Sequence, residues 1–184
     1  QEAIREAIEG YYENSMKKEL LIVDGYNIIG AWPHLVKLKN QDKMEDARDS
    51  LLHELSNYQK YTGIKIRVVF DAQFVPGIQQ SYEKYQLTVV FTKEGETADS
   101  YIERVVGIEN TIVTQVTVAT SDLAEQWIVF QKGALRKSAN ELFSDVKRIK
   151  KAIEADTKEY RLQSYRRNSP WSHHQMDRLE KLRD

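Results

Sequence analysis

Short apolar runs alternate with longer amphipathic segments along most of the chain. The first run, at residues 20–23, ends in Asp24, and further runs rich in β-branched residues occupy 64–70, 87–91 and 114–119. Such runs are typical of strands buried on both faces of a parallel sheet. Apolar residues at helical spacing predict helices at 44–61, 97–108, 123–131 and 138–163.

Local signals set three of the helix boundaries. Thr97 is a suitable N-cap, and Gly63 and Gly133 are placed as helix terminators. Strands that alternate with helices predict βαβ units, right-handed crossovers and a mainly parallel sheet. The segment 72–86 has no predicted element, and we interpret it as a mobile loop beside the site.

Acidic residues follow the predicted strands at the points where the strands end. Asp24 and Asp71 come directly after apolar runs, and Asp122 follows another run after two polar residues. Ligands of open parallel sheets bind beyond the carboxyl ends of the strands, so we expect these acids on one rim. A fourth acid, Asp99, starts a helix after the loop 91–96, which should carry it to the same rim.

A cluster of such acids suits a divalent metal. Carboxylates held together repel one another and raise one another's pKa unless a cation lies between them. Oxygen ligands without His or Cys suit Mg²⁺ or Mn²⁺. Metal-assisted phosphodiester hydrolysis needs this arrangement, because the metal orients a water molecule and neutralises charge on the phosphate.

Each acid also has a purely structural interpretation. Asp24 suits a turn, Asp71 suits a strand end, Asp99 complements a helix dipole, and Asp122 with Glu125 fits a capping box. For a single acid the structural interpretation is stronger than the functional one. For the set, it requires several coincidences on one rim, so we favour the metal site.

Charge and composition exclude some classes of protein for this chain. The formal net charge is −1, yet residues 147–184 hold eleven Lys or Arg and six acidic residues. This basic stretch on an acidic body suits a nucleic-acid partner, although a solvated helix with many ion pairs explains the charge as well. Cysteine is absent, which excludes disulfides, Cys-ligated zinc and a cysteine nucleophile. No apolar run reaches the ~20 residues that span a bilayer, so we expect no membrane partner and a cytoplasmic location.

Six blocks of sequence occur in the order of a known family. They read DGYNIIGAW at 24–32, VFDA at 69–72, FTKE at 91–94, ETAD at 96–99, ATSD at 119–122 and GALRKSA at 133–139. Together they resemble the YacP-type NYN domain, a group of PIN-like nucleases, over roughly residues 18–153. The resemblance implies an α/β fold, a PIN-like three-layer α/β/α sandwich with a mainly parallel central sheet.

The resemblance also implies an activity and its residues. It implies a divalent-metal endoribonuclease acting on single-stranded RNA, with Mg²⁺ or Mn²⁺ as cofactor. The catalytic and metal-binding positions carry over to Asp24, Asp71, Asp99 and Asp122. The best-known members of this group are ribosome-associated enzymes that cut mRNA during translation, which implies mRNA and the ribosome as partners.

Four further residues are candidates for RNA binding. Asn27 could hydrogen-bond a phosphate oxygen or only stabilise its own turn. Lys93 lies on the rim loop with the acids. Arg136 and Lys137 could form a cation pair for the RNA backbone, or only begin a surface helix. Glu96, another rim acid, is retained as a metal ligand or as a support for one.

The roles of two aromatic residues and two alternative classes of function stay open. Tyr26 and Trp32 could stack on bases, but aromatics near a sheet edge are more often part of the core. A phosphatase or phosphoryl-transfer enzyme with an aspartyl nucleophile is one alternative, although its usual second Asp is replaced here by Tyr26. The other is a non-catalytic RNA- or ribosome-binding module.

The resemblance also suggests how the chain is organised. Residues 1–17 are interpreted as an N-terminal extension or a cloning remnant, and no role is given to them. Residues 18–155 form the predicted PIN-like NYN nuclease domain. Residues 156–184 form a predicted basic helical tail.

Overall fold

The computed structural model describes residues 2–6, 8, 17–74, 85–168, 175, 177–178 and 181. The chain divides into two compact units, Gln1–Val146 and Lys147–Asp184. We call them the sheet unit and the tail unit, and each is described by itself. The domain boundary expected at residue 155 stays a prediction.

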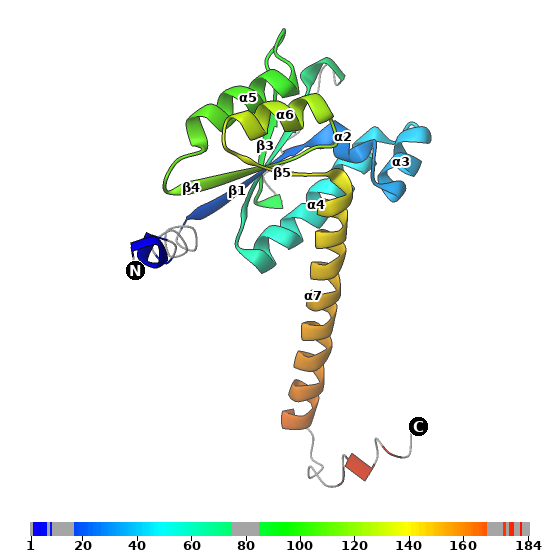
Figure 1. Cartoon of the computed structure of the whole chain (residues 1–184). Coiled ribbons are helices and arrows are strands. Elements are labelled where there is room, and N and C mark those ends of the chain that lie inside the picture. The colour runs from blue at the N-terminus through cyan, green and yellow to red at the C-terminus, as the bar shows by residue number, and fades with distance from the viewer. Residues whose placement is uncertain are drawn as a thin grey trace. The chain divides into compact units, whose positions relative to one another are not determined.

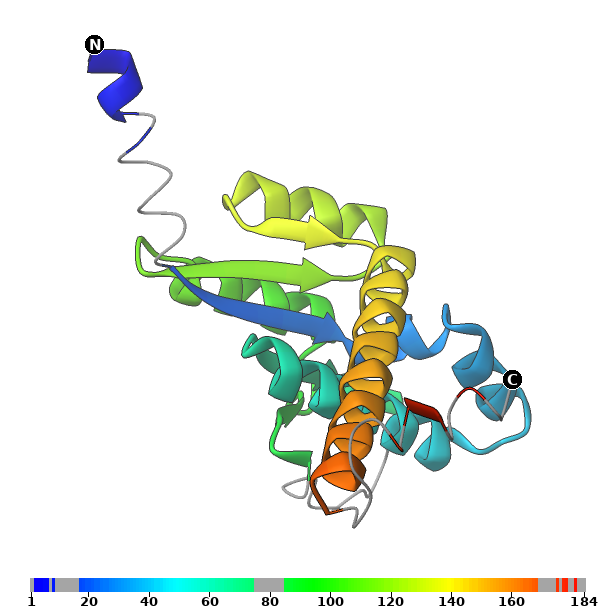
Figure 2. The same ribbon diagram turned by 90° about the horizontal axis from the view of Figure 1, so that it is seen from below.

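A five-stranded parallel sheet forms the centre of the sheet unit. Its strands are β1 (Lys18–Asp24), β2 (Lys65–Phe70), β3 (Thr88–Phe91), β4 (Thr114–Ala119) and β5 (Leu135–Lys137). Their order is β3-β2-β1-β4-β5, and every neighbouring pair is parallel. The arrowheads of β1, β4 and β5 point the same way in Figure 2. The carboxyl ends of all five strands therefore meet at one edge.

Helices cover both faces of this sheet. They are α2 (Gly25–Ile29), α3 (Pro33–Asn40), α4 (Met44–Thr62), α5 (Ala98–Glu109), α6 (Leu123–Gln131) and α7 (Ala139–Asn168), with a 3₁₀ turn η1 (Ala72–Phe74). Helices α5 and α6 lie on one face and α4 on the other (Figure 1). These three layers confirm the predicted α/β/α fold. α7 begins in the sheet unit and continues into the tail unit.

The central strand explains why the core forms on both sides. Successive side chains of a strand alternate between faces. Ile22 of β1 packs in a buried cluster with Ile102 of α5 and Val129 of α6. Leu21 and Val23 point to the opposite face and are buried as well. The continuous apolar run of β1 is therefore buried on both faces, as predicted.

The predicted helix boundaries follow from local chemistry that the structure confirms. The Thr97 hydroxyl accepts a hydrogen bond from the backbone N–H of Ser100 (3.1 Å) and so caps α5. Gly63 and Gly133 follow α4 and α6 with φ of 76° and 77°, in the left-handed region that favours glycine.

Three short elements were not predicted. α2 and α3 follow β1 closely, and β5 has only three residues, two of them basic. Elements of this length carry too few residues to show a period, and β5 exists because it pairs with β4. α7 also runs to Asn168, beyond the predicted end at 163. Of the predicted loop 72–86, residues 75–84 lie outside the described residues.

Among the described residues, no helix combines the length and the apolar character needed to cross a bilayer.

Candidate active site

Three carboxylates meet at the carboxyl edge of the sheet. Asp24 is the last residue of β1, Asp99 lies in the first turn of α5, and Glu125 lies in the first turn of α6. Each offers one carboxylate oxygen such that all three atoms lie within 4.8 Å of one another. We call these three residues the carboxylate cluster. Asp24 and Glu125 are buried while Asp99 is exposed, so Asp99 is the member that faces solvent.

The turn after β1 brings the chain close to β2. Gly25 follows Asp24 directly, and a Cβ at this position would overlap the ring of Phe70 at the end of β2. The Phe70 ring is fully buried and lies 5.0 Å from the Tyr26 ring, centroid to centroid. Only glycine permits this approach, which holds the end of β1 against its neighbour.

Thr120 links three parts of the rim. Its hydroxyl lies 3.3 Å from Oδ2 of Asp24, to which it donates, and accepts a hydrogen bond from the backbone N–H of Asp122 (3.1 Å). Its carbonyl accepts from Nε2 of Gln126 (2.6 Å), and its N–H donates to the carbonyl of Lys137 (3.0 Å). Thr120 is fully buried. The turn after β4 is thereby joined to β1, α6 and β5, and the Asp24 carboxylate is held in place.

Glu125 is the least satisfied group of the cluster. Its side chain is buried, with 4% of its surface exposed, and neither carboxylate oxygen has a hydrogen-bond partner within the described part of the chain. Burial, and then the charges of Asp24 and Asp99, raise the pKa of Glu125 to about 9. Without a cation, Glu125 therefore retains a proton at neutral pH.

The pKa values of the other two carboxylates are raised as well. Burial raises the pKa of Asp24, and the charge of Asp99 adds to this effect. Desolvation also raises the pKa of Asp99, followed by the charges of Asp122 and Asp71. The protein thus holds three acids at a spacing that costs free energy when all three are charged.

The residues of the cluster fit a divalent cation. Carboxylate oxygens are the ligands that Mg²⁺ and Mn²⁺ prefer, and among the described residues the two oxygens of Glu125 lack the donors that buried polar atoms normally have. A cation at this position would provide the missing partner and remove the repulsion that raises the three pKa values. Asp24, Asp99 and Glu125 are therefore the residues that would hold it.

Two of the predicted acids lie at the same edge but outside this cluster. The Asp122 carboxylate accepts hydrogen bonds from the backbone N–H groups of Ala124 (2.9 Å) and Glu125 (3.4 Å), and so caps α6. Asp71 is buried after β2, and its carboxylate accepts from the N–H of Gln73 (2.9 Å). Both act electrostatically on Asp99, as described above.

The predicted RNA-binding residues occupy different surroundings. The Asn27 side-chain oxygen accepts from the N–H of Ser121 (2.8 Å) and joins the turn after β1 to the turn after β4. Lys93 is exposed on the loop between β3 and α5. The Arg136 guanidinium lies 5.9 Å from the Phe130 ring centroid, while Nζ of Lys137 bonds Asp145 in α7. Successive residues of β5 point to opposite faces, so Arg136 and Lys137 do not form one compact pair.

Glu96 and Trp32 lie away from the carboxylate cluster. Glu96 accepts from the Arg104 guanidinium (2.9 Å), and this hydrogen bond lowers the pKa of Glu96. Trp32 is fully buried and donates its indole N–H to the carbonyl of Ala139 (2.9 Å). Its ring is part of the core and is not accessible to a base.

Sequence reasoning considered Glu125 only as the partner of Asp122 in a candidate capping box and so missed its place in the cluster. In that motif the glutamate accepts from the N–H of the N-cap residue. Here the N–H of Asp122 donates to Thr120 instead, and Glu125 turns toward Asp24 and Asp99. The signal present in the sequence was the position of Glu125 in the first turn of a helix that begins on the acidic rim.

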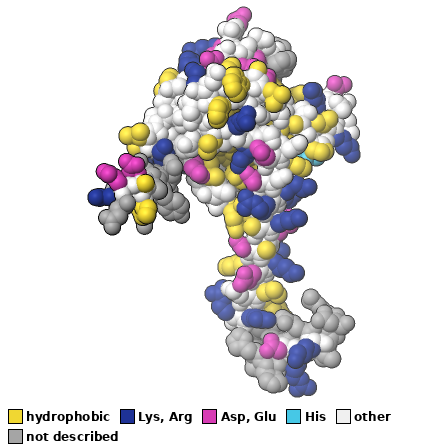
Figure 3. Space-filling view, in the orientation of Figure 1, with side chains coloured by type: hydrophobic (Ala, Val, Ile, Leu, Met, Phe, Trp, Pro, Cys, Tyr) yellow, Lys and Arg dark blue, Asp and Glu magenta, His cyan; other side chains and the backbone are white. Residues whose placement is uncertain are grey.

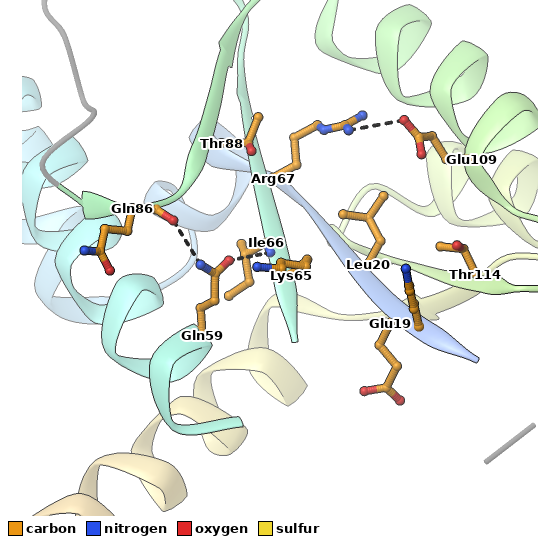
Figure 4. A pocket seen from close by; sticks show the side chains of 11 residues that line it. Glu19, Leu20, Gln59, Lys65, Ile66, Arg67, Gln86, Thr88, Glu109 and Thr114 are labelled. Atoms are coloured by element: carbon orange, nitrogen blue, oxygen red, sulfur yellow. Dashed lines mark hydrogen bonds and ion pairs between the residues drawn. The ribbon is translucent and has the colours of Figure 1, made fainter. Parts of the chain in front are cut away.

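A cavity lies at the opposite, amino edge of the sheet. This cavity of about 350 Å³ is lined by residues of β1, β2, β3 and α4 among others (Figure 4). Several of its polar groups are paired: Arg67 bonds Glu109 (3.2 Å), and the Gln59 side chain bonds the N–H of Ile66 (2.8 Å) and the carbonyl of Gln86 (3.0 Å). We call this region the amino edge. It offers no group of three carboxylates among the residues that line it.

Comparison with known proteins gives consistent matches. The family model of the YacP-like NYN domain matches residues 21–184. "Uncharacterized protein YacP" of Bacillus subtilis (strain 168) is 50% identical over 136 residues, which is 74% of this chain and 79% of that protein. A crystal structure of Rae1 (YacP) from Bacillus subtilis is 44% identical, with a TM-score of 0.70, and covers 89% of this chain and 94% of that one. The structure of a single-substitution variant of Rae1 is 46% identical, with a TM-score of 0.69, over 77% of this chain and 83% of that one.

Proposed function

The chain belongs to the YacP-like NYN domain family, and from this premise we propose that it is a divalent-metal-dependent endoribonuclease. Membership of this PIN-like nuclease family supports a nuclease type of function. The finer proposal is hydrolysis of phosphodiester bonds in single-stranded RNA. One observation carries it: the carboxylate cluster, in which a buried Glu125, whose oxygens accept no hydrogen bond from an N–H group of the described residues, faces Asp24 and Asp99.

The chemistry requires positive charge at this cluster. When bound, a divalent cation supplies that charge, which lowers the pKa of a water molecule and neutralises the phosphate. Asp24 and Glu125 are the buried ligands of this proposal, and their surroundings hold them rigidly. Thr120 fixes Asp24 by a hydrogen bond, and the cap formed by Asp122 fixes the first turn of α6.

Asp99 has a different part in the proposal. It is the exposed member of the cluster and therefore the one that incoming RNA can reach. Asp71 and Asp122 surround it with negative charge, which keeps anions away from an empty site. RNA then binds productively only when the cluster is neutralised, so substrate binding and metal binding should be coupled.

We extend the proposal to mRNA on the ribosome, as the resemblance to YacP-type enzymes implies. The tail unit supports a polyanionic partner, because the described part of α7 beyond Val146 exposes many Lys and Arg side chains (Figure 3). Phosphate contacts from such cations position RNA without reading its sequence. Selection of the cleavage position would then come from the ribosome and not from base recognition.

The test is cleavage of a labelled mRNA by the purified full chain, with and without ribosomes, in Mg²⁺, Mn²⁺ or EDTA. We expect internal cleavage with a divalent metal, none in EDTA, and none with Glu125→Gln. The matched control is Glu19→Gln, a change of the same type on an exposed residue at the amino edge. Mn²⁺ affinity, measured directly by titration, should fall for Glu125→Gln and stay unchanged for Glu19→Gln.

The same preparation tests the alternatives. Release of inorganic phosphate from a phosphomonoester, without cleavage of RNA, would make the protein a phosphatase. Binding of RNA or ribosomes without cleavage in any metal would make it a non-catalytic binding module. Full activity of Glu125→Gln would contradict the role given to the carboxylate cluster.

A further inference from the structure

An exposed aromatic face lies on the outer side of α6. Leu123, Trp127 and Phe130 are spaced to share one side of this helix, and 78%, 58% and 60% of their surfaces are exposed. The Trp127 and Phe130 rings lie 6.1 Å apart, centroid to centroid, at an interplanar angle of 28°. Figure 3 shows hydrophobic side chains gathered over α6. We call these three residues the α6 face.

A cation borders this face. The Arg136 guanidinium of β5 lies over the Phe130 ring, 5.9 Å from its centroid. Large aromatic residues such as Trp127 and Phe130 are usually buried in the core or in an interface. Unpaired bases stack on aromatic rings that lie next to an arginine. The face thus offers both a surface for bases and a charge for a phosphate.

The α6 face belongs to the same helix as the site. Asp122 caps α6, Glu125 in its first turn faces the carboxylate cluster, and Trp127 lies on the other side. A helix with its side chains is about 10–12 Å across, so the path around half of its circumference is about 16–19 Å. Stacked nucleotides rise by about 3.4 Å each, so a strand of roughly five or six nucleotides covers that path. One RNA strand can therefore reach the cluster and the α6 face together.

We propose that the α6 face binds unpaired bases of the RNA a few nucleotides away from the bond that is cut. This inference rests on the proposed function and adds a base-stacking subsite to it. Stacking tolerates every base because every base has a π face, which suits an enzyme that does not read sequence. Arg136 contributes the phosphate contact at this subsite.

A protein partner fits this face less well than RNA. Stable protein interfaces bury about 800 Å² on each partner and involve some 20–30 residues a side. Three side chains beside an exposed arginine supply a small part of that area. Their number and their chemistry match a few stacked bases.

The test measures binding of a short single-stranded oligouridine by the full chain in EDTA, which separates binding from cleavage. Trp127→Ala should weaken binding about tenfold or more, the usual effect of losing one stacked base. Trp127→Phe, which retains a ring, should stay within about threefold of the wild type. Ile112→Ala is the control, because 87% of Ile112 is exposed and it lies outside the α6 face, and this variant should bind as the wild type does.

Two further readouts separate stacking from a structural effect. A ribose–phosphate strand without bases should bind the wild type and Trp127→Ala equally, because it has nothing to stack. At saturating mRNA in Mg²⁺, Trp127→Ala should keep its kcat and raise KM. A wild type that binds oligouridine but cuts no RNA would contradict the proposed function and leave the subsite standing.

Other results would overturn the subsite itself. Equal oligouridine affinity of Trp127→Ala and the wild type would do so, as would an equal loss of affinity for the strand without bases. A dimeric wild type that Trp127→Ala makes monomeric, with unchanged RNA affinity, would show that the α6 face joins two copies of the chain.

Discussion

The two edges of the central sheet are built from the same strands but differ in how their charges are paired. At the amino edge Arg67 meets Glu109, and Gln59 satisfies both backbone groups it reaches. At the carboxyl edge three acidic side chains meet, and the oxygens of Glu125 accept no hydrogen bond from an N–H group of the described residues. Like its neighbouring strands, β1 runs from one edge to the other, from Lys18 at the amino edge to Asp24 at the carboxyl edge.

This difference distinguishes a surface with paired groups from the proposed metal site. Paired groups lower the free energy of the folded chain, whereas like charges held together raise it and are characteristic of functional sites. Helix dipoles favour acids at the carboxyl edge, because α5 and α6 begin there, but they do not by themselves produce the contrast between the edges. Side chains of the turns and helices create it, and four measurements can sharpen or break it.

The largest effect is expected on catalysis at the carboxyl edge. Asp24→Asn and Asp99→Asn should each lower the rate of RNA cleavage by about a thousandfold or more, because each removes a charged metal ligand. The folded state without metal should be as stable as the wild type or more stable, since repulsion is relieved. Cleavage assays together with thermal unfolding in EDTA check both parts. Wild-type cleavage by both variants would show that these residues are not ligands.

The next effect is on stability as a function of pH. The Glu125 pKa is about 9 in the folded chain and 4.5 in an ordinary environment, so the folded state binds the extra proton between these values. Stability without metal should therefore fall as pH rises from about 5 to 9, by on the order of a few kcal/mol. Glu125→Gln should lose most of this dependence, and saturating Mg²⁺ should reverse it. Chemical unfolding in EDTA across that pH range is the measurement, and a flat wild-type profile would contradict the prediction.

A smaller effect is expected on the salt dependence of RNA binding. Arg136→Ala with Lys137→Ala should weaken RNA or ribosome binding and reduce the log–log salt slope by roughly 0.7 for each phosphate that is no longer neutralised. Because Lys137 is already bonded to Asp145, Arg136→Ala alone should account for most of the change. The double variant should still cut a minimal substrate at high concentration. An unchanged slope across a salt series would show that neither residue contacts RNA.

The smallest effect is expected at the amino edge. The ion pair of Arg67 and Glu109 is partly exposed, with 20% and 41% of the side chains accessible. Pairs of this kind contribute about 0.2–1 kcal/mol, so Glu109→Gln should shift the free energy of unfolding by no more than that. Its cleavage rate should match the wild type. A large loss of activity would erase the distinction between the two edges.

Much of the fold could be predicted from the sequence because its signals are local. The apolar run of β1, the N-cap Thr97 and the terminating Gly63 each act through neighbouring residues. The order of strands and helices then restricts the topology, because crossovers between parallel strands are right-handed. β5 could not be predicted, because three residues become a strand only when β4 lies beside them.

Only part of the site could be predicted from the sequence in the same way. The position of acids after strands could be seen in the sequence, and the parallel sheet brings Asp24 and Asp99 to one edge. The presence of Glu125 beside them became visible only in the folded chain, because Thr120 accepts from the N–H that a capping glutamate would have used. The fold also buries Trp32 and leaves Trp127 exposed, a difference that the neighbours of these two residues in the sequence do not show. Burial and hydrogen-bond competition depend on residues far apart in the chain, and neither can be seen in the spacing of residues along it.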